Sequence, residues 1–365
     1  MKSDNEYMVQ ALQLAEKGMF TCHPNPRVGC VIVANDVVGE GWHEKTGGPH
    51  AEIVALKQAG KRAKGATVYV TLEPCCHKGK TGPCTKALIN AGVSRVVIAM
   101  QDPNPEVAGQ GITELREAGI EVETGVLEAD ARALNPGFIM RMSKGRPYVR
   151  SKLAMSLDGR TAMASGESKW ITGEEARRDV QFLRACSSAI VTGIGTILAD
   201  DPSMTVRINT LVDNKQFEQP LRIILDPRLS TPPSARILEQ NGKTLIVTTS
   251  EEPEVVTDLT KAGAEILLQE GRQDTIDLHE LMKYLAEEEV NEVLLETGAT
   301  LGGAMLQAGL IDEFVIYMAP HLMGNDARGL FNLSGIESMD QRISLDIQEI
   351  RAIGKDWRIT AKITH

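Results

Sequence analysis

The segment from Pro74 to Cys84 reads PCCHKGKTGPC and gathers three of the chain's six cysteines, with a histidine, into one polar stretch. Disulfide partners, reactive thiols and metal ligands could each explain such clustering. The N-terminal sequence MKSDNEYMVQALQLAEKG is polar and has a helical pattern, so we expect no signal peptide. A chain that is not exported is expected in the cytoplasm, where proteins seldom form disulfides. We therefore interpret the cluster as metal ligands, and Cys22 and Cys30 as packing cysteines.

A second stretch, PHAEIVAL at residues 49–56, supplies partners for these thiols. A catalytic zinc ion takes three protein ligands and keeps one position for water, and His50, Cys75 and Cys84 would fill the three places. Zinc lowers the pKa of a bound water, and a nearby carboxylate can carry protons to a leaving group. Glu52 lies two residues after His50 at a helix start, so both side chains could reach one pocket.

The choice of ligands leaves alternatives open. Cys76 and His77 could take the place of Cys75, although the Pro-Cys order favours Cys75. His43, in GWHEKTG, is more typical of a loop residue or a substrate contact than of a ligand. Asn25, between two prolines, has amide groups that suit the edge of a pyrimidine, but it could also be a simple turn residue.

The remaining pattern predicts two α/β domains. The chain has 365 residues, 42% of them hydrophobic, which is enough for about two domains. Strand and helix patterns alternate along both halves, and the basic segment MRMSKGRPYV at residues 140–149 is the expected boundary. The net charge of −10 argues against a nucleic-acid-binding protein. No apolar run is long enough to span a bilayer.

Local signals predict where the candidate ligands lie. EYMVQALQLAEKG predicts a helix with Gly18 as its C-cap, and HAEIVALKQAG predicts a helix stopped at Gly60. Cys75 follows a predicted strand. Cys84 opens a predicted helix, whose N-terminus would stabilise a thiolate. The C-terminal sequence IQEIRAIGKDWRITAKI predicts a terminal hairpin.

These motifs carry a family resemblance. H-x-E followed by P-C and a later cysteine resembles the signature of zinc deaminases, in which the glutamate is the general acid/base and not a ligand. The loop CHKGKTGP is longer than in P-C-x-x-C. Together with PNPRVGCVIV and GWHEKTGGPHAE, it resembles the deaminase half of the bifunctional riboflavin-biosynthesis enzymes, the pyrimidine deaminase/reductases. That family usually has Arg-Thr-Pro-Pro-Cys where this chain has residues 80–84, KTGPC, a divergence that leaves the predicted ligands in place.

The resemblance implies a cytidine-deaminase-like three-layer domain over residues 1–144. It implies that Glu52 is the general acid/base, that His50, Cys75 and Cys84 bind zinc, and that Asn25 contacts substrate.

The second half contains glycine turns suited to a nucleotide. VTGIGTILADDP places Gly193 and Gly195 after a strand but lacks the third glycine of the dinucleotide fingerprint. EVLLETGATLGGAMLQAG runs from a buried strand through Gly298, Gly302 and Gly303 into a helix whose N-terminus could bind phosphate. Tight packing of the strand against the helix is the alternative explanation.

Four segments resemble the reductase half of the same family: RPYVRSKLAMSLDGRTA, SKWITGEEARRDVQFLRA, AIVTGIGTILADDPSMTVR and LLETGATLGGAMLQAGLIDEFVIYMAP. This implies a dihydrofolate-reductase-like domain over residues 147–365 that uses NADPH. By position, the resemblance implies an NADPH site made of Ala154, Trp170, Thr196, Asp200, Gly298, Ala299, Thr300, Leu301, Gly302, Gly303 and Ala304. It implies a substrate site made of Ser168, Arg184, Met204, Arg207 and Glu296. Lys152 is a further candidate for this site, because it lies in the strand before the SLDG turn.

Two of these assignments have competitors, and the role of Asp158 in the SLDG turn is also open. Arginines bind a ribose phosphate well, but Arg184 lies in a helical pattern and could instead form a surface salt bridge. Asp200 and Asp201 compete for one role, which the family position gives to Asp200. Asp158 could bind or could form the turn through its side chain.

The resemblance implies two consecutive reactions of riboflavin synthesis. The first is hydrolytic deamination of 2,5-diamino-6-ribosylamino-4(3H)-pyrimidinone 5′-phosphate. The second is NADPH reduction of the ribosyl chain to give 5-amino-6-(5-phospho-ribitylamino)uracil. We expect Zn²⁺ and NADPH as cofactors, a homodimer in the cytoplasm, and a small-molecule substrate without nucleic-acid or membrane partners.

Two other functions compete with this prediction. A deaminase of nucleosides or tRNA is disfavoured by the acidic balance and the long loop. A structural zinc module with a nucleotide-sensing domain is disfavoured because structural zinc sites usually have four protein ligands.

Overall fold

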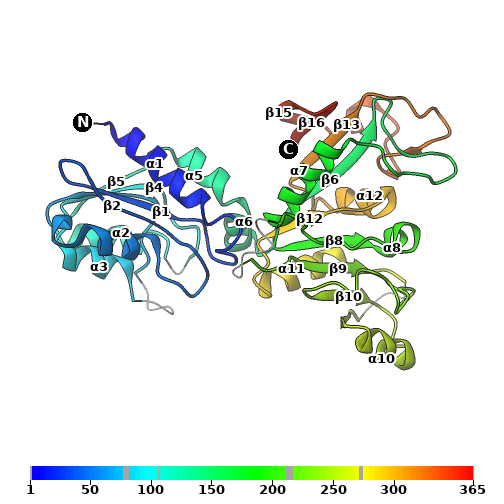
Figure 1. Ribbon diagram of the computed structural model, residues 1–365, viewed down its shortest axis with the longest axis horizontal. Coiled ribbons are helices and arrows are strands. Elements are labelled where there is room, and N and C mark those ends of the chain that lie inside the picture. The colour runs from blue at the N-terminus through cyan, green and yellow to red at the C-terminus, as the bar shows by residue number, and fades with distance from the viewer. Residues whose placement is uncertain (1, 77–81, 106, 210–216, 271–273, 365) are drawn as a thin grey trace. The chain divides into compact units, whose positions relative to one another are not determined.

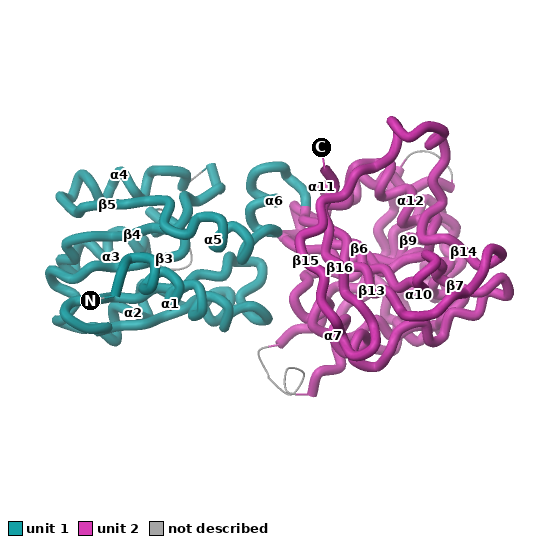
Figure 2. The backbone as a smooth tube through the Cα atoms, turned by 90° about the horizontal axis from the view of Figure 1, so that it is seen from above, with its two compact units in different colours: residues 1–146 teal, residues 147–365 magenta. Residues whose placement is uncertain are grey.

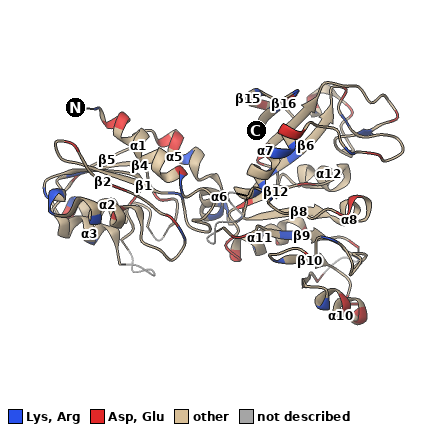
Figure 3. Ribbon diagram, viewed as in Figure 1, with Lys and Arg blue, Asp and Glu red and all other residues tan. Residues whose placement is uncertain are grey.

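The computed structural model describes residues 2–76, 82–105, 107–209, 217–270 and 274–364. The backbone forms two compact units, Met1–Arg146 and Pro147–His365 (Figure 2). Lys and Arg positions are interspersed with Asp and Glu positions in each unit (Figure 3). Within the described ranges, no helix is long and apolar enough to cross a membrane.

The first unit is built on a five-stranded sheet with the strand order β2-β1-β3-β4-β5. β1 is antiparallel to β2 and β3, whereas β3, β4 and β5 are parallel. The parallel strands end at one edge, which is where ligand sites of such sheets commonly lie. The strands are β1 (Gly29–Val33), β2 (Val37–Trp42), β3 (Thr67–Leu72), β4 (Arg95–Met100) and β5 (Glu121–Thr124).

Helices cover both faces of this sheet (Figure 1). Side chains alternate along β1, so that Cys30 and Ile32 pack in one apolar cluster while Val31 and Val33 pack in the other. The result is a three-layer α/β/α unit. The first face carries α2 (Ala51–Ala59), the 3₁₀ turn η1 (Gly60–Ala63), α3 (Cys84–Ala91) and α4 (Gln110–Glu117), and the second α1 (Asp4–Glu16), α5 (Glu128–Leu134) and α6 (Pro136–Lys144).

Two predicted helix ends have different outcomes. α2 is capped by Gly60 with φ of +55°, as predicted. The prediction for Gly18 is wrong, because α1 ends at Glu16 and its C-cap is Lys17. A β-carbon at Gly18 would lie 2.6 Å from the carbonyl oxygen of His43. Gly18 is therefore needed for a close approach between two backbone segments.

The second unit is built on a nine-stranded sheet with the order β11-β10-β9-β8-β12-β6-β13-β16-β15. The seven strands from β11 to β13 are parallel, and the predicted terminal hairpin adds β16 and β15 antiparallel at one edge. β7 and β14 form a separate pair. The strands are β6 (Tyr148–Ser156), β7 (Arg160–Ala162), β8 (Ala189–Gly193), β9 (Leu221–Leu225), β10 (Thr244–Thr248), β11 (Ala264–Leu268), β12 (Glu292–Leu295), β13 (Glu313–Ala319), β14 (Arg328–Gly329), β15 (Leu345–Ile353) and β16 (Asp356–Ile363).

Helices again cover both faces. Val149 and Leu153 of β6 pack on the face of α11 and α12, so Lys152 between them points to the opposite face. Ile190 and Ile224 pack on that opposite face with α7, α8 and α10. The helices are α7 (Glu174–Ala185), α8 (Ile194–Asp200), α10 (Pro253–Lys261), α11 (Leu278–Glu287) and α12 (Ala299–Gln307), with a 3₁₀ turn η2 (Met339–Gln341).

Candidate zinc and reductase sites

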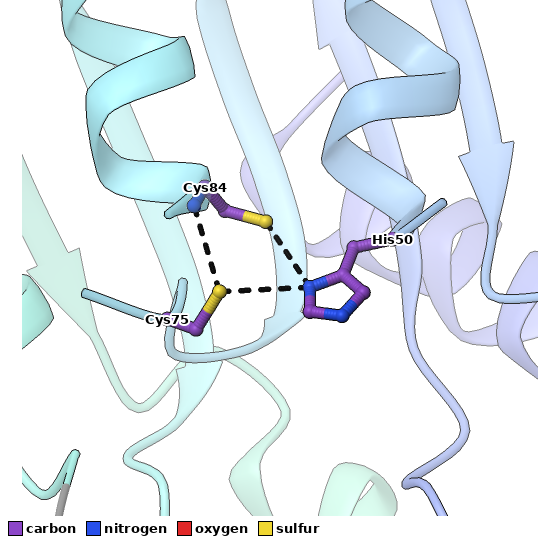
Figure 4. A group of neighbouring side chains, drawn as sticks. All are labelled: His50, Cys75 and Cys84. Atoms are coloured by element: carbon purple, nitrogen blue, oxygen red, sulfur yellow. Dashed lines mark hydrogen bonds between the residues drawn. The ribbon is translucent and has the colours of Figure 1, made fainter. Parts of the chain in front are cut away.

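The structure brings the three predicted zinc ligands of the first unit together. His50 is the N-cap of α2, Cys84 is the first residue of α3, and Cys75 follows β3. His50 Nδ1 lies 3.3 Å from the Cys84 sulfur and 3.5 Å from the Cys75 sulfur (Figure 4). Their candidate ligand atoms all lie within 4.8 Å of one another. The histidine motif thus meets the cysteine motif where α2 and α3 begin, beside the segment that follows β3.

The donor set fits zinc. One nitrogen and two sulfurs are the ligands that this ion prefers, and three of them leave a position for water. A hydrogen bond from Cys84 lowers the pKa of the Cys75 thiol to about 4, and the same bond raises the pKa of Cys84. The Cys84 backbone N–H, at the start of α3, also donates to Cys75 at 3.5 Å. His77, the alternative ligand, lies outside the described residues, as do Lys80 and Thr81 of the divergent loop.

Glu52 is a buried carboxyl group beside these ligands. It lies in the first turn of α2 and is only 3% exposed. Burial raises its pKa above the ordinary value, and the nearby Cys75 raises it further. A carboxyl group with little solvent and a raised pKa can hold a proton between two transfers. The place of Glu52 is therefore compatible with the predicted acid/base role.

Asn25 reaches the same region through His43. Asn25 Nδ2 lies 2.9 Å from His43 Nε2, and His43 Nδ1 lies 3.1 Å from the carbonyl oxygen of Pro49. Because the carbonyl can only accept, Nδ1 carries the proton and Nε2 accepts from Asn25. The His43 ring stands edge-on to that of His50, with 5.5 Å between centroids. His43, for which the sequence indicated a loop position or a substrate contact, thus joins Asn25 to the ligand cluster.

Sequence reasoning missed Glu73, which supports the Cys75 segment. Its buried carboxylate accepts backbone N–H bonds from Asp102, Gly109 and Ile112 at 3.2, 3.0 and 3.1 Å. The carboxylate therefore fixes the loop before α4 and the first turn of that helix against the residues that lead to Cys75. An acidic residue directly after the buried strand β3, just before Pro-Cys, was the available signal.

In the second unit, Arg184 and Glu296 form a buried pair. The Arg184 Nε and Nη2 atoms donate to the two Glu296 carboxylate oxygens at 2.6 and 3.0 Å. Each side chain is about 10% exposed, so a surface salt bridge is the wrong explanation for Arg184. The remaining Arg184 nitrogen, Nη1, donates to the Thr205 carbonyl at 2.9 Å. Arg184 therefore serves mainly to hold Glu296 and the segment after α8.

Two more cations surround this pair. The pKa of Lys152 is lowered, mainly by burial. The nearby Glu296 opposes this shift, and the nearby Arg184 adds to it. Partial desolvation and the neighbouring Arg184 lower the pKa of Arg207. Burial alone would raise the pKa of Glu296, but Arg184, Lys152 and Arg207 outweigh it and lower that pKa. Three cations against one carboxylate make this locus positive, which suits a phosphorylated ligand.

The glycine turn at α12 divides into an open part and a packed part. Gly298 is the N-cap, and a β-carbon there would meet nothing within 4 Å. A β-carbon at Gly303 would lie 2.2 Å from the carbonyl oxygen of Asn332, and one at Gly302 would lie 3.4 Å from the Phe331 ring. Close packing thus explains Gly303, whereas a β-carbon at Gly302 would make only an ordinary van der Waals contact. The open helix start at Gly298 is the part that a phosphate could approach.

Lys169, also missed from the sequence, links two predicted cofactor residues. Its Nζ lies 3.2 Å from Asp200 Oδ1. The adjacent Trp170 is 70% exposed, and the guanidinium of Arg177 lies over its ring, 4.6 Å from the centroid. Asp201 instead pairs with Arg236 at 3.5 Å. The two aspartates therefore have separate partners, and Asp200 is the one tied to the Trp170 segment.

The remaining predicted residues are placed less decisively. Ala154 is half-buried in β6 and paired with Tyr317 of β13. Thr196 is half-buried in α8, and Ser168 is half-buried in the segment before α7. The side chain of Met204 is buried in the apolar cluster of α7 and α8, so only its backbone could face a substrate.

Comparisons with known proteins match both units. Residues 1–100 match the family model "Cytidine and deoxycytidylate deaminase zinc-binding region", and residues 147–359 match "RibD C-terminal domain". The riboflavin biosynthesis protein RibD of Escherichia coli is 50% identical over 361 residues, which cover 97% of each chain. The protein of the same name from Haemophilus influenzae is 47% identical and covers 98% of this chain and 96% of its own.

Solved structures agree over the whole length. Acinetobacter baumannii RibD has a TM-score of 0.92 at 47% identity, and 99% of each chain is covered. A Thermotoga maritima diaminohydroxyphosphoribosylaminopyrimidine deaminase/5-amino-6-(5-phosphoribosylamino)uracil reductase has a TM-score of 0.87 at 32% identity, again with 99% of each chain covered. These matches confirm the predicted family, the fold class and the two cofactors, zinc and NADPH. The chain therefore belongs to the RibD family of riboflavin biosynthesis proteins, which pair a zinc-binding deaminase domain with a reductase domain.

Proposed function

We propose that residues 1–144 deaminate 2,5-diamino-6-ribosylamino-4(3H)-pyrimidinone 5′-phosphate and that residues 147–365 reduce the ribosyl chain of the product with NADPH. The observation that carries the proposal is the convergence of His50, Cys75 and Cys84 beside the buried Glu52. Three ligands and one carboxylate suit a catalytic zinc site better than a structural one. Family membership supports the second activity.

In the deaminase site, Glu52 would move the protons. Zinc held by His50, Cys75 and Cys84 supplies the Lewis acidity that makes water nucleophilic near neutral pH. Glu52 takes up the proton that the attacking water loses, and delivers it to the amine that leaves as ammonia. Its burial next to the ligands limits exchange of that proton with solvent.

Asn25 would hold the pyrimidine. Its amide nitrogen donates to His43, so its carbonyl oxygen has a defined direction and can accept from a ring N–H or amine. His43 in turn is fixed by Pro49, the residue before the His50 ligand. The substrate contact and the metal ligand thus share one rigid connection.

In the reductase site, the positive cluster would bind the phosphorylated sugar. Arg184 directs its forked donors to Glu296 and its third nitrogen to Thr205. Arg207 is exposed beside this pair, which makes it the better candidate for the phosphate. Lys152 and Glu296 lie on the same face of the sheet and would contact the sugar hydroxyls. They orient the first sugar carbon toward the nicotinamide.

NADPH, which supplies the hydride, would bind along the ends of β8 and β12. These strands are neighbours in the sheet and lead into α8 and α12. The first N–H groups of α12, at Ala299 and Thr300, have no acceptor within the helix and therefore suit a phosphate. Trp170 and Asp200, joined through Lys169, would flank the cofactor, with Thr196 and Ala154 lining it.

We further propose a homodimer formed through the terminal hairpin. Ile347 and Ile350 are 55% and 54% exposed on edge strand β15. A bulge between Ile347 and Glu349 keeps both isoleucines on one face, opposite Ala361 and Ile359. Arg351 and Arg358, by contrast, pair with Asp179 of α7. The hairpin thus turns its charged face inward and its apolar face outward, an arrangement that favours a second copy.

The dimer has a simple test. An Ile350→Lys substitution should convert a dimer to a monomer in sedimentation velocity, while Lys362→Ala on the same hairpin should not. A wild-type chain that sediments as a monomer at micromolar concentration would refute the dimer. A cytoplasmic location is also proposed, because a reducing compartment keeps the thiols of Cys75 and Cys84 available as metal ligands.

The test of the two activities is NADPH oxidation with the diaminopyrimidine phosphate as sole substrate, before and after zinc is stripped. Oxidation should stop on stripping and return when the deaminated product is supplied. Absence of oxidation with either compound would exclude the reductase assignment. Ammonia release from free nucleosides, but not from the pyrimidine phosphate, would favour a nucleoside deaminase instead.

A further inference from the structure

The segment that carries Asn25 is held by a residue more than a hundred positions away. The Asn135 side chain pairs with both backbone groups of Arg27: its Oδ1 accepts from the Arg27 N–H at 2.8 Å, and its Nδ2 donates to the Arg27 carbonyl at 2.9 Å. Arg27 answers with its own side chain, whose Nη1 donates to the Leu134 carbonyl at 2.6 Å. Three hydrogen bonds therefore join one short loop to the junction of α5 and α6.

Asn135 is used here in an unusual way. It precedes Pro136, the first residue of α6, where an asparagine normally caps the helix with its side chain. No such cap bond forms, because the amide is turned to Arg27 instead. Asn135 is 5% exposed, so its two hydrogen bonds are shielded from water. The Asn135 side chain therefore bonds to the distant loop instead of capping α6.

From Arg27 the contacts lead directly to the metal site. Asn25 lies two residues before Arg27 and bonds to His43 at 2.9 Å. The backbone N–H of His43 donates to Val28, the residue after Arg27, at 2.9 Å. The loop that Asn135 holds is thus joined to His43 at both ends, and His43 stands against the His50 ring.

We propose that Asn135 is a positioning residue of the deaminase, which fixes Asn25 for the pyrimidine by clamping the backbone of Arg27. This inference rests on the proposed substrate contact of Asn25. Asn135 does not touch the substrate, so its removal should act only through the loop. A shift of about 1 Å in a substrate-binding group costs up to about a hundredfold in rate.

The experiment uses the full-length zinc enzyme with Asn135→Ala and Asn135→Asp. The aspartate keeps the shape and the bond from the Arg27 N–H, but sets an acceptor against the Arg27 carbonyl. Both variants should raise the KM for deamination about 10-fold or more, with a smaller change in kcat. Zinc content, and reduction of the deaminated product by the second unit, should stay at wild-type values. Ser143→Ala, which removes an exposed hydrogen bond within α6, is the matched control.

A double-mutant cycle with Asn25→Ala separates positioning from a general effect on the fold. If Asn135 acts through Asn25, the effect of Asn135→Ala on deaminase kcat/KM should largely disappear in the Asn25→Ala background. An undiminished effect there, loss of zinc, or unchanged deamination in both variants would overturn the inference. Failure of the proposed function is distinct: the wild-type enzyme would not deaminate the substrate, or Asn25→Ala alone would leave KM unchanged.

Discussion

The two candidate sites of this chain are built on different principles. In the first unit, two short motifs supply every predicted zinc ligand, from two helix starts and the segment after β3, and the ligand atoms lie within 4.8 Å of one another. In the second unit, the charged cluster is assembled from β6, α7, the segment after α8 and the end of β12. Metal ligands at a fixed spacing can be recognised from the sequence alone. Single charged residues that lie on separate elements cannot.

The sites also differ in charge. The first combines two thiols, a histidine and one buried carboxyl group, an arrangement that a divalent cation completes. The second holds three cations around one carboxylate, an arrangement that an anionic ligand completes. Because the two sites lie in separate compact units, we expect each activity to be lost without the other, and the predictions use this independence.

The largest effect is expected from loss of a zinc ligand. Cys84→Ser should abolish detectable deamination and reduce zinc to well below one ion per chain, because no replacement ligand of equal affinity is present at that position. The reductase, supplied with deaminated product, should keep its kcat. Metal analysis and the two separate assays check this. Equal loss of both activities would show that the two sites are not independent.

Glu52→Gln should come next. Removing the proton carrier should lower deaminase kcat by about 10²- to 10⁴-fold, with zinc retained, since glutamine keeps the shape but cannot accept the proton. The measurement is steady-state ammonia release together with zinc content. A reduction of less than about tenfold would contradict a proton-transfer role for this side chain.

In the second unit, Arg184→Met should leave Glu296 buried without its partner and should destabilise that unit by about 3–5 kcal/mol. The double variant Arg184→Met/Glu296→Gln should recover much of the stability, because no unpaired buried charge remains. It should not recover the reductase activity, because the carboxylate of Glu296 is lost. Chemical denaturation and NADPH oxidation distinguish the two effects. Full recovery of activity in the double variant would remove Glu296 from the substrate site.

A smaller effect separates the two parts of the α12 turn. Gly303→Ala should cost about 1–3 kcal/mol, because its β-carbon would collide with the backbone of Asn332. Gly298→Ala has open space and an ordinary φ of −78°, so stability should barely change while the KM for NADPH rises. Thermal unfolding and cofactor titration test the pair. An unchanged KM in Gly298→Ala would place the phosphate elsewhere.

The smallest effect concerns Asp158, which clamps its own turn to the loop after β13. It accepts from Ser156 and from the backbone of Met323 and Gly324, and the bond from Ser156 leads in lowering its pKa from 3.8 to about 2. Because the folded-state pKa is lowered, these bonds add stability above about pH 4 that is lost as pH falls toward 2. The stability difference between wild type and Asp158→Asn should therefore shrink over that range in acid titrations. A constant difference would contradict the clamp.

Much of the fold followed from local patterns. The sequence predicted the terminal hairpin, the Gly60 cap and the strand before Cys75, because capping residues and apolar periodicity act over a few positions. The prediction for Gly18 was wrong, because its requirement comes from the backbone of His43, in the segment after β2. Gly303 is similar, since only the fold brings Asn332 against it.

By itself, the sequence was enough to identify the family and to predict the ligand set and the neighbouring carboxyl group. Thiol and imidazole ligands at given spacings have few other uses, and two helix starts with the segment after β3 suffice to present them. Only the tertiary structure decided how the rest is held: the Arg184 pair with Glu296, the Glu73 carboxylate under the Cys75 segment, and the clamp of Asn135 on Arg27. These contacts join residues separated by 29 to 112 positions, and side chains that distant meet only when the sheets bring their elements together.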